Sequence, residues 1–234
     1  MRTFTCPGGH FQYHATSDLV DEGDTITFFE DPPSHAAKVR GGHGYLAPME
    51  ERGPWKTISV EERYSTPWIA VSHHEVIDPS GRSGIYGVIH FKNLAVGIVA
   101  LDADLNTWIV GQYRYPLGVY SWEIPEGGGR RDLPPIESAR RELREEVGIE
   151  ATRWTEILHM DLSNSASDEE AILFVAQDLS FFEPEPDHNE ELAMRKLPFD
   201  ELYAMVQRGE IRDSLTVAAV LKVKLMLLDG SLTP

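Results

Sequence analysis

From Pro54 onward the chain alternates apolar and polar residues, a pattern typical of strands that bury one face. The alternation runs through W-K-T-I-S-V-E-E-R-Y-S-T-P-W-I-A-V-S-H-H-E-V-I, stops at the turn sequence D-P-S-G-R of residues 78–82, and resumes in I-Y-G-V-I-H-F. We therefore expect a leading β-hairpin over residues 55–92. His73 and His74 point to opposite faces of such a strand, and ordinary surface and core positions account for both.

Further strand patterns follow on both sides of a charged central segment. Before it come A-V-G-I-V-A-L, the turn D-A-D-L-N-T, W-I-V-G-Q-Y-R-Y-P and S-W-E-I-P. After it come W-T-E-I-L-H-M, the loop S-N-S-A-S-D-E-E and A-I-L-F-V-A, while E-E-L-A-M-R-K-L alternates like a closing strand. These segments predict a β-sheet that the central segment interrupts.

The central segment has a helical period. Ile136, Ala139, Leu143 and Val147 recur on one side of a helix that Gly148 can end. We expect this apolar side to pack against the sheet.

A second helical region covers residues 198–230. It predicts a short helix ended by Gly209 and a last helix that Asp213 or Ser214 can cap and Gly230 can end. Apolar residues occupy more than one side of this last helix, so we expect it to be buried or to face another subunit.

A separate side of the central helix carries Glu142, Glu145 and Glu146 within about 100° of arc. Like charges one turn apart repel each other by a few tenths of a kcal/mol on an exposed helix. Arg141 can offset Glu145 and can pair with Glu137, but Glu142 and Glu146 have no obvious helical partner of opposite sign. Divalent cations prefer such oxygen clusters, although an acidic helix side alone is usually just solvated.

The full spacing around these acids resembles the Nudix box, G-x5-E-x7-R-E-U-x-E-E-x-G-U with U aliphatic. Gly127 begins it, and after thirteen intervening residues R-E-L-R-E-E-V-G-I occupies residues 141–149. One position departs from the pattern, because Leu133 stands where the family usually has a glutamate that is mainly thought to shape the loop. The resemblance covers about residues 55–230. It implies an α/β/α sandwich around a mixed β-sheet, here with an N-terminal β-rich arm.

The resemblance also implies a metal site. In the family the acids at the places of Glu142, Glu145 and Glu146 hold the ions, and Glu145 and Glu146 are also counted with the catalytic residues. The carbonyl just before the box glycine is a further ligand, which here is the main chain of Glu126. Mg²⁺ is the expected metal, with Mn²⁺ as an alternative.

Two elements point to the substrate diphosphate. The sequence Q-Y-R-Y-P of residues 112–116 is similar to the Q-[FY]-R-x-P element of ADP-sugar pyrophosphatases, whose arginine lies near the substrate. Arg114 is therefore our candidate cation for the diphosphate, with a surface ion pair as the alternative. The glycine run that starts at Gly127 can let the backbone approach a phosphate.

The loop S-N-S-A-S-D-E-E contains the candidate residue that activates the attacking water. In the sugar-diphosphate branch an acid at the place of Glu169 positions or deprotonates this water, and Glu170 is the adjacent competitor. ADP-ribose members commonly carry S-P-G where this chain has Ser163, Asn164 and Ser165. The choice between ADP-ribose and another NDP-sugar therefore stays open.

Composition and charge limit the class of protein and its cellular compartment. The chain has 234 residues, 41% of them hydrophobic, which suits a globular core, and we expect residues 1–54 to form a poorly ordered extension. A net charge of −17 argues against nucleic acid. The apolar run Leu94–Leu101 is too short to cross a bilayer, and the start of the chain lacks a secretory signal. With only Cys6 and no internal disulfide, these features favour a cytoplasmic protein.

The sequence thus predicts a metal-dependent pyrophosphohydrolase that acts on a nucleoside diphosphate linked to a sugar. A Nudix-type sensor that binds a nucleotide sugar without cleaving it is the alternative, and loss of the box acids would mark such a module. All three acids are present. The Y-S-T-P-W of residues 64–68 resembles the leading region with which NDP-sugar pyrophosphatases of the family build a dimer, so a homodimer is expected.

Overall fold

The computed structural model describes residues 4–6, 9–11, 50–185 and 192–233. The chain forms two units, residues 1–43 and 44–234. In the first unit, strands β1 (Phe4–Cys6) and β2 (Gly9–Phe11) pair antiparallel. The expectation of a poorly ordered extension over residues 1–54 falls mostly outside the described residues.

The second unit begins with an antiparallel four-stranded sheet, which we call the arm. Its order is β3-β4-β5-β6, with bounds Glu50–Arg52, Trp55–Ser65, Ile69–Ile77 and Ser83–Phe91. The turn predicted at residues 78–82 is present and joins β5 to β6, but residues 55–92 hold three strands rather than the two of the predicted hairpin. The missed turn is made by Thr66, whose hydroxyl accepts hydrogen bonds from the backbone N–H groups of Trp68 and Ile69. No glycine marks this turn, but Pro67 lies in it and is a sequence signal against one continuous strand.

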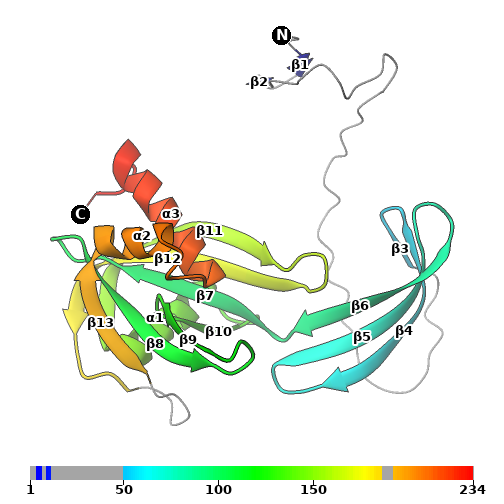
Figure 1. The fold of residues 1–234 in the computed structure, drawn as a ribbon, viewed down its shortest axis with the longest axis horizontal. Helices are drawn as coiled ribbons and strands as arrows, with labels where there is room; N and C mark the ends of the chain where they lie inside the picture. Colours follow the sequence, from blue (N-terminus) through cyan, green and yellow to red (C-terminus); the bar gives the residue numbers. More distant parts are fainter. Residues whose placement is uncertain (1–3, 7–8, 12–49, 186–191, 234) are drawn as a thin grey trace. The chain divides into compact units, whose positions relative to one another are not determined.

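The main sheet is mixed, with order β10-β7-β12-β11, in which β7 and β12 run parallel and the other pairs run antiparallel. A second, antiparallel sheet has the order β13-β8-β9. Figure 1 shows β6 running on into β7, which joins the arm to the main sheet. The bounds are β7 Asn93–Ala100, β8 Asn106–Arg114, β9 Val119–Glu123, β10 Glu126–Arg130, β11 Ile149–Leu162, β12 Glu169–Phe181 and β13 Ala193–Pro198.

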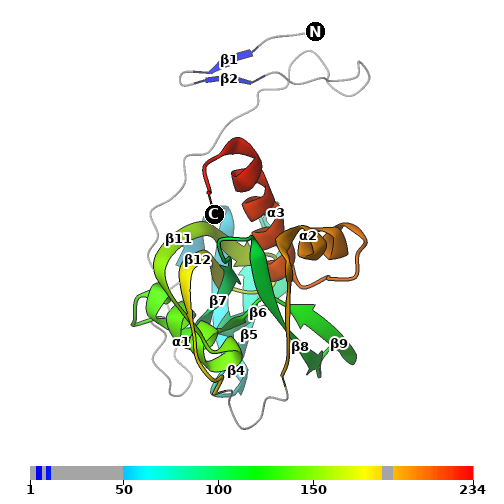
Figure 2. The ribbon, with the colours of Figure 1, turned by 90° about the vertical axis from the view of Figure 1, so that its left-hand side faces the viewer.

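Helices cover both faces of the main sheet (Figures 1 and 2). They are α1 (Pro135–Val147), α2 (Phe199–Gln207) and α3 (Ser214–Asp229). Side chains of β7 point alternately to the two faces of the sheet, so they enter two separate core clusters. Val96 and Ile98 pack in the cluster that contains Leu143 of α1. Val99 packs in the other cluster, with Val220 of α3. The predicted α/β/α sandwich with a β-rich arm is confirmed. Within the described residues, no helix has both the length and the apolar character needed to cross a bilayer.

The helix ends follow the sequence signals. Helix α1 ends at Gly148, which has φ = 65°, and α3 ends at Gly230, with φ = 76°. At the start of α3 the Asp213 side chain accepts a hydrogen bond from the N–H of Thr216 at 2.7 Å. The position of Gly148 is also crowded, because an added Cβ would lie 2.2 Å from the carbonyl oxygen of Phe182.

Replacing Gly148 by alanine should therefore destabilise the protein more than the same change at Gly230. Both glycines have a positive φ, which costs a residue with a Cβ roughly 1–2 kcal/mol, but nothing lies within 4 Å of a Cβ at Gly230. We expect Gly148→Ala to lower the free energy of unfolding by more than about 2 kcal/mol and Gly230→Ala by about 1 kcal/mol. Urea unfolding measures both values, and equal losses would contradict the close packing at Gly148.

Candidate active site

A cavity of about 990 Å³ opens between the second sheet, β10, the β11–β12 loop and the start of α3. Its lining is strongly acidic among the described residues. Arg114 and Arg212 are the basic residues that line it, and the acids are Glu123, Glu126, Asp161, Glu169, Glu210 and Asp213. An anionic ligand entering this cavity therefore needs additional positive charge.

Helix α1 brings its acids against the edge of the cavity at β10. A Cβ on Gly127 would lie 2.3 Å from the carboxylate carbon of Glu142, so this carboxylate occupies the space that a side chain would fill. The Glu146 carboxylate accepts a hydrogen bond from the N–H of Glu126 at 3.1 Å. Arg141 completes the connection by donating to the carbonyl oxygen of Gly128 at 3.0 Å.

The box acids do not form the solvated helix face that the acids alone suggest. Glu142 is only 9% exposed and Glu146 only 5% exposed. The expected pairing is also corrected: the Arg141 guanidinium binds Glu142 as well as Glu145, and Glu137 pairs with Arg140 instead. Helical i,i+4 spacing does not predict the contact between Arg141 and Glu142, because adjacent side chains on a helix come together only when both pack against a neighbouring strand.

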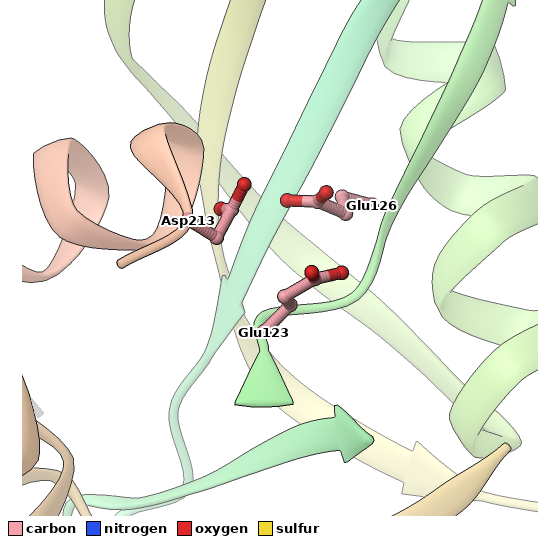
Figure 3. Close-up of side chains that lie close together, drawn as sticks. All are labelled: Glu123, Glu126 and Asp213. Carbon is pink, nitrogen blue, oxygen red and sulfur yellow. The ribbon is translucent and has the colours of Figure 1, made fainter. Parts of the chain in front are cut away.

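A second group of acids lies at the floor of the cavity. Figure 3 shows the carboxylates of Glu123, Glu126 and Asp213 pointing toward one another, and their nearest oxygens lie within 4.8 Å. Glu123 is 2% exposed, and Oε2 of Glu126 is buried without a hydrogen-bond partner in the described structure. Burial, and then the charges of Asp213 and Glu123, raise the pKa of the Glu126 carboxyl well above its usual value.

Sequence reasoning missed most of this acidic group. It considered Glu126 only through its main chain and Asp213 only as a helix cap, and it did not single out Glu123. A signal for Glu123 existed, because an acid at an inward position of a strand needs a buried partner. No sequence pattern predicts the contact between Glu123 and Asp213, because one lies on β9 and the other at the start of α3, far apart in the chain.

Arg114 is the partner of this acidic group. Its Nε donates to both carboxylate oxygens of Glu123 at 3.0 Å, and its Nη2 donates to Glu126 at 2.8 Å. Burial alone would lower the pKa of Arg114, but the hydrogen bond to Glu123 and the neighbouring negative charges raise it. Arg114 thus does form ion pairs, as the alternative expected, but with carboxylates that are only 2% and 10% exposed rather than with surface acids. Nη1 makes no hydrogen bond to the described residues and remains available.

The two candidate loop acids lie in different surroundings. Glu169 lines the cavity, and burial raises the pKa of its carboxyl. Glu170 instead accepts a hydrogen bond from Arg131 at 2.8 Å and lies 3.4 Å from the ring of His159. The hydrogen bond from Arg131 lowers the pKa of Glu170. Of the two, Glu169 is thus the one placed to meet a ligand.

The donor set suits divalent cations. Carboxylate and carbonyl oxygens are the ligands that Mg²⁺ and Mn²⁺ prefer, and here such oxygens come from α1 and β10 together. Beside them, the carboxylates of Glu123, Glu126 and Asp213 lie within 4.8 Å of one another, with Arg114 paired to the first two. The described residues therefore fit a metal-assisted reaction on an anionic substrate.

Comparison with known proteins gives the class. Residues 91–218 match the NUDIX domain, and residues 55–89 match the nucleoside diphosphate sugar hydrolase N-terminal domain. The chain belongs to the Nudix family, whose enzymes use divalent metals.

Individual relatives agree with this class. An ADP-ribose pyrophosphatase of Mycobacterium tuberculosis is 37% identical over 175 residues, which cover 72% of this chain and 83% of the relative. A methanol dehydrogenase activator of Bacillus methanolicus is 30% identical over 167 residues, 70% of this chain and 90% of the relative. The crystal structure of an ADP compounds hydrolase is similar in fold, with a TM-score of 0.69 and 21% identity over 77% of this chain and 98% of that chain.

The fit between Glu142 and Gly127 gives a test of metal binding. Gly127→Ala should displace the Glu142 carboxylate and weaken Mn²⁺ binding about tenfold or more, the usual effect of disturbing a ligand's support. Gly128→Ala is the matched control, because its Cβ would meet only the Asn93 side chain, at 3.3 Å. Electron paramagnetic resonance of free Mn²⁺ measures both affinities, and equal affinities for the two variants would contradict the close fit.

Proposed function

We propose that this protein is a divalent-metal-dependent pyrophosphohydrolase that cleaves the diphosphate of ADP-ribose or another nucleoside diphosphate linked to a sugar. The packing of the buried box acids Glu142 and Glu146 on Glu126 and Gly127 beside the cavity carries the proposal. A cavity of about 990 Å³ lies at the upper end of the range for small-molecule sites and suits a dinucleotide-sized ligand. The relative named as an ADP-ribose pyrophosphatase supports the same substrate class.

Glu142, Glu145, Glu146 and the main-chain carbonyl of Glu126 would hold Mg²⁺, or Mn²⁺ in its place. Bound ions would neutralise the non-bridging phosphate oxygens and favour in-line attack by water. The residues of the chain position these carboxylates: Gly127 leaves room for Glu142, and the N–H of Glu126 orients Glu146.

The remaining roles follow from the lining of the cavity. Glu169 accepts the proton of the attacking water, because it lines the cavity and burial raises the pKa of its carboxyl, which makes the carboxylate a stronger base. Arg114 binds the diphosphate through its available Nη1 while Glu123 and Glu126 hold the rest of its guanidinium. Gly127 lets the backbone of β10 approach the substrate.

The arm supports a homodimer as the working assembly. It matches the nucleoside diphosphate sugar hydrolase N-terminal domain. The arm also exposes several large apolar side chains that a partner subunit could cover, namely Val60, Tyr64, Trp68 and Ile85.

A hydrolysis assay tests the proposed function against the sensor alternative. We expect Mg²⁺- or Mn²⁺-dependent release of a nucleoside monophosphate from at least one member of a panel of ADP-ribose, ADP-glucose, GDP-mannose, UDP-glucose and NADH. Glu146→Gln should bind nucleotide but turn over more than about tenfold more slowly, which corresponds to a barrier increase above roughly 1.4 kcal/mol. Tight binding without turnover by the unaltered protein would instead support the sensor.

The roles of Glu169 and Glu170 can be separated by paired substitutions. Glu169→Gln should lower kcat strongly with little change in KM or in the Mg²⁺ requirement, whereas Glu170→Gln should stay within a few fold. A base must be ionised, so activity should fall as the pH falls through the raised pKa of Glu169, and this acidic limb should disappear in Glu169→Gln. If Glu170→Gln collapses kcat and Glu169→Gln does not, the assignment is wrong by one residue.

A further inference from the structure

The loop that precedes Glu169 is hydrogen-bonded to strand β6 of the arm. Ile89 of β6 donates its N–H to the carbonyl of Ala166 at 2.8 Å, and its own carbonyl accepts from the N–H of Asp168 at 3.2 Å. The hydroxyl of Tyr86, on the same strand, donates to the carbonyl of Ser165 at 2.6 Å. The β11–β12 loop therefore continues the edge of the arm as a short parallel bridge.

The Asp168 side chain adds two further hydrogen bonds between the loop and the arm. One carboxylate oxygen accepts the N–H of Phe91 at 2.8 Å, and the other lies 2.7 Å from Nδ1 of His90. The Nε2 atom of His90 lies 2.9 Å from the hydroxyl of Ser72, which in turn lies 2.7 Å from Nε2 of His74. A continuous chain of hydrogen bonds thus runs from the loop into the interior of the arm.

One proton assignment satisfies the whole chain. If Nδ1 of His90 carries the proton it donates to Asp168, Nε2 then accepts from the Ser72 hydroxyl, and Ser72 accepts from Nε2 of His74. Because every donor in this series meets an acceptor, the His90 ring has a fixed orientation. Such a ring holds the Asp168 carboxylate in one place.

The order Ser72, His90, Asp168 matches that of a hydrolytic triad, but nucleophilic catalysis does not fit. Ser72 is only 5% exposed and does not line the cavity. Glu169, which follows Asp168 directly, does line the cavity. The chain of hydrogen bonds therefore ends next to the candidate base.

We propose that His90 and Asp168 are positioning residues that hold the β11–β12 loop so that Glu169 faces the cavity. This inference rests on the proposed function, in which Glu169 serves the attacking water. It assigns the arm a second task besides any role in dimerisation, because strands β5 and β6 fix the geometry of a group that reacts in the neighbouring domain. A displacement of about 1 Å at such a group can cost up to a hundredfold in rate.

The test compares variants that remove or keep the donor to Asp168. His90→Leu removes it, and we expect kcat to fall about tenfold with KM and the Mg²⁺ requirement unchanged. His90→Asn places an amide N–H near the position of Nδ1 and should restore most of the lost kcat. In a Glu169→Gln background, His90→Leu should have no further effect, because the two residues act through the same step.

The matched control is His159→Leu, which removes a histidine beside the adjacent acid Glu170 and should leave kcat within about twofold. Hydrogen exchange gives a readout that does not need turnover: residues 163–168 should exchange faster in His90→Leu and in Asp168→Asn. Unchanged exchange, or an equal loss of kcat with and without Glu169, would overturn the proposal. Absence of turnover on every substrate, together with faster exchange, would overturn the proposed function and leave the fastening of the loop in place.

Discussion

The close approach of the Glu142 carboxylate to the backbone of Gly127 is the constraint on which the rest of the site depends. This approach is possible only because position 127 has no Cβ, and it brings α1 within reach of β10. Two carboxylates, those of Glu142 and Glu146, are buried at this contact. Buried charge is costly unless it is paired, so the hydrogen bonds from Arg141 and from the N–H of Glu126 are part of the fold as well as of the site.

This arrangement links metal binding to stability. The protein supplies Arg141 to Glu142 and Glu145, and Arg114 to Glu123 and Glu126, yet the described lining of the cavity keeps an excess of acids. Cations that bind the folded chain more tightly than the unfolded one raise its free energy of unfolding, by an amount that grows with the logarithm of the free cation concentration once the site is filled. Under the proposed function, ions held by the acids would supply the positive charge that a diphosphate needs, so a strongly negative protein would not require the broad basic surface of a polyanion-binding protein.

Local features of the fold could be predicted from the sequence, whereas contacts between residues far apart in the chain could not. The helix over residues 135–147, its end at Gly148 and the cap at Asp213 each depend on neighbouring residues, so periodicity and capping rules identify them. The burial of Glu146 and the convergence of Glu123 with Asp213 depend on how α1 and α3 pack on the sheet, which no spacing encodes. The turn at Thr66 is formed by a side-chain hydroxyl without glycine, and Pro67 is its one local signal in the sequence.

The central claim is that the box acids on α1 and the backbone of β10 together hold the metal that meets the diphosphate. An anomalous difference map, from crystals grown with Mn²⁺ and a non-hydrolysable ADP-ribose analogue, tests it most directly. The account predicts peaks at coordination distance from the carboxylates of Glu142 and Glu146 and from the carbonyl of Glu126, with the diphosphate bound beside them. Peaks confined to the Glu123, Glu126 and Asp213 side chains, or a bound diphosphate without any peak at α1, would contradict it.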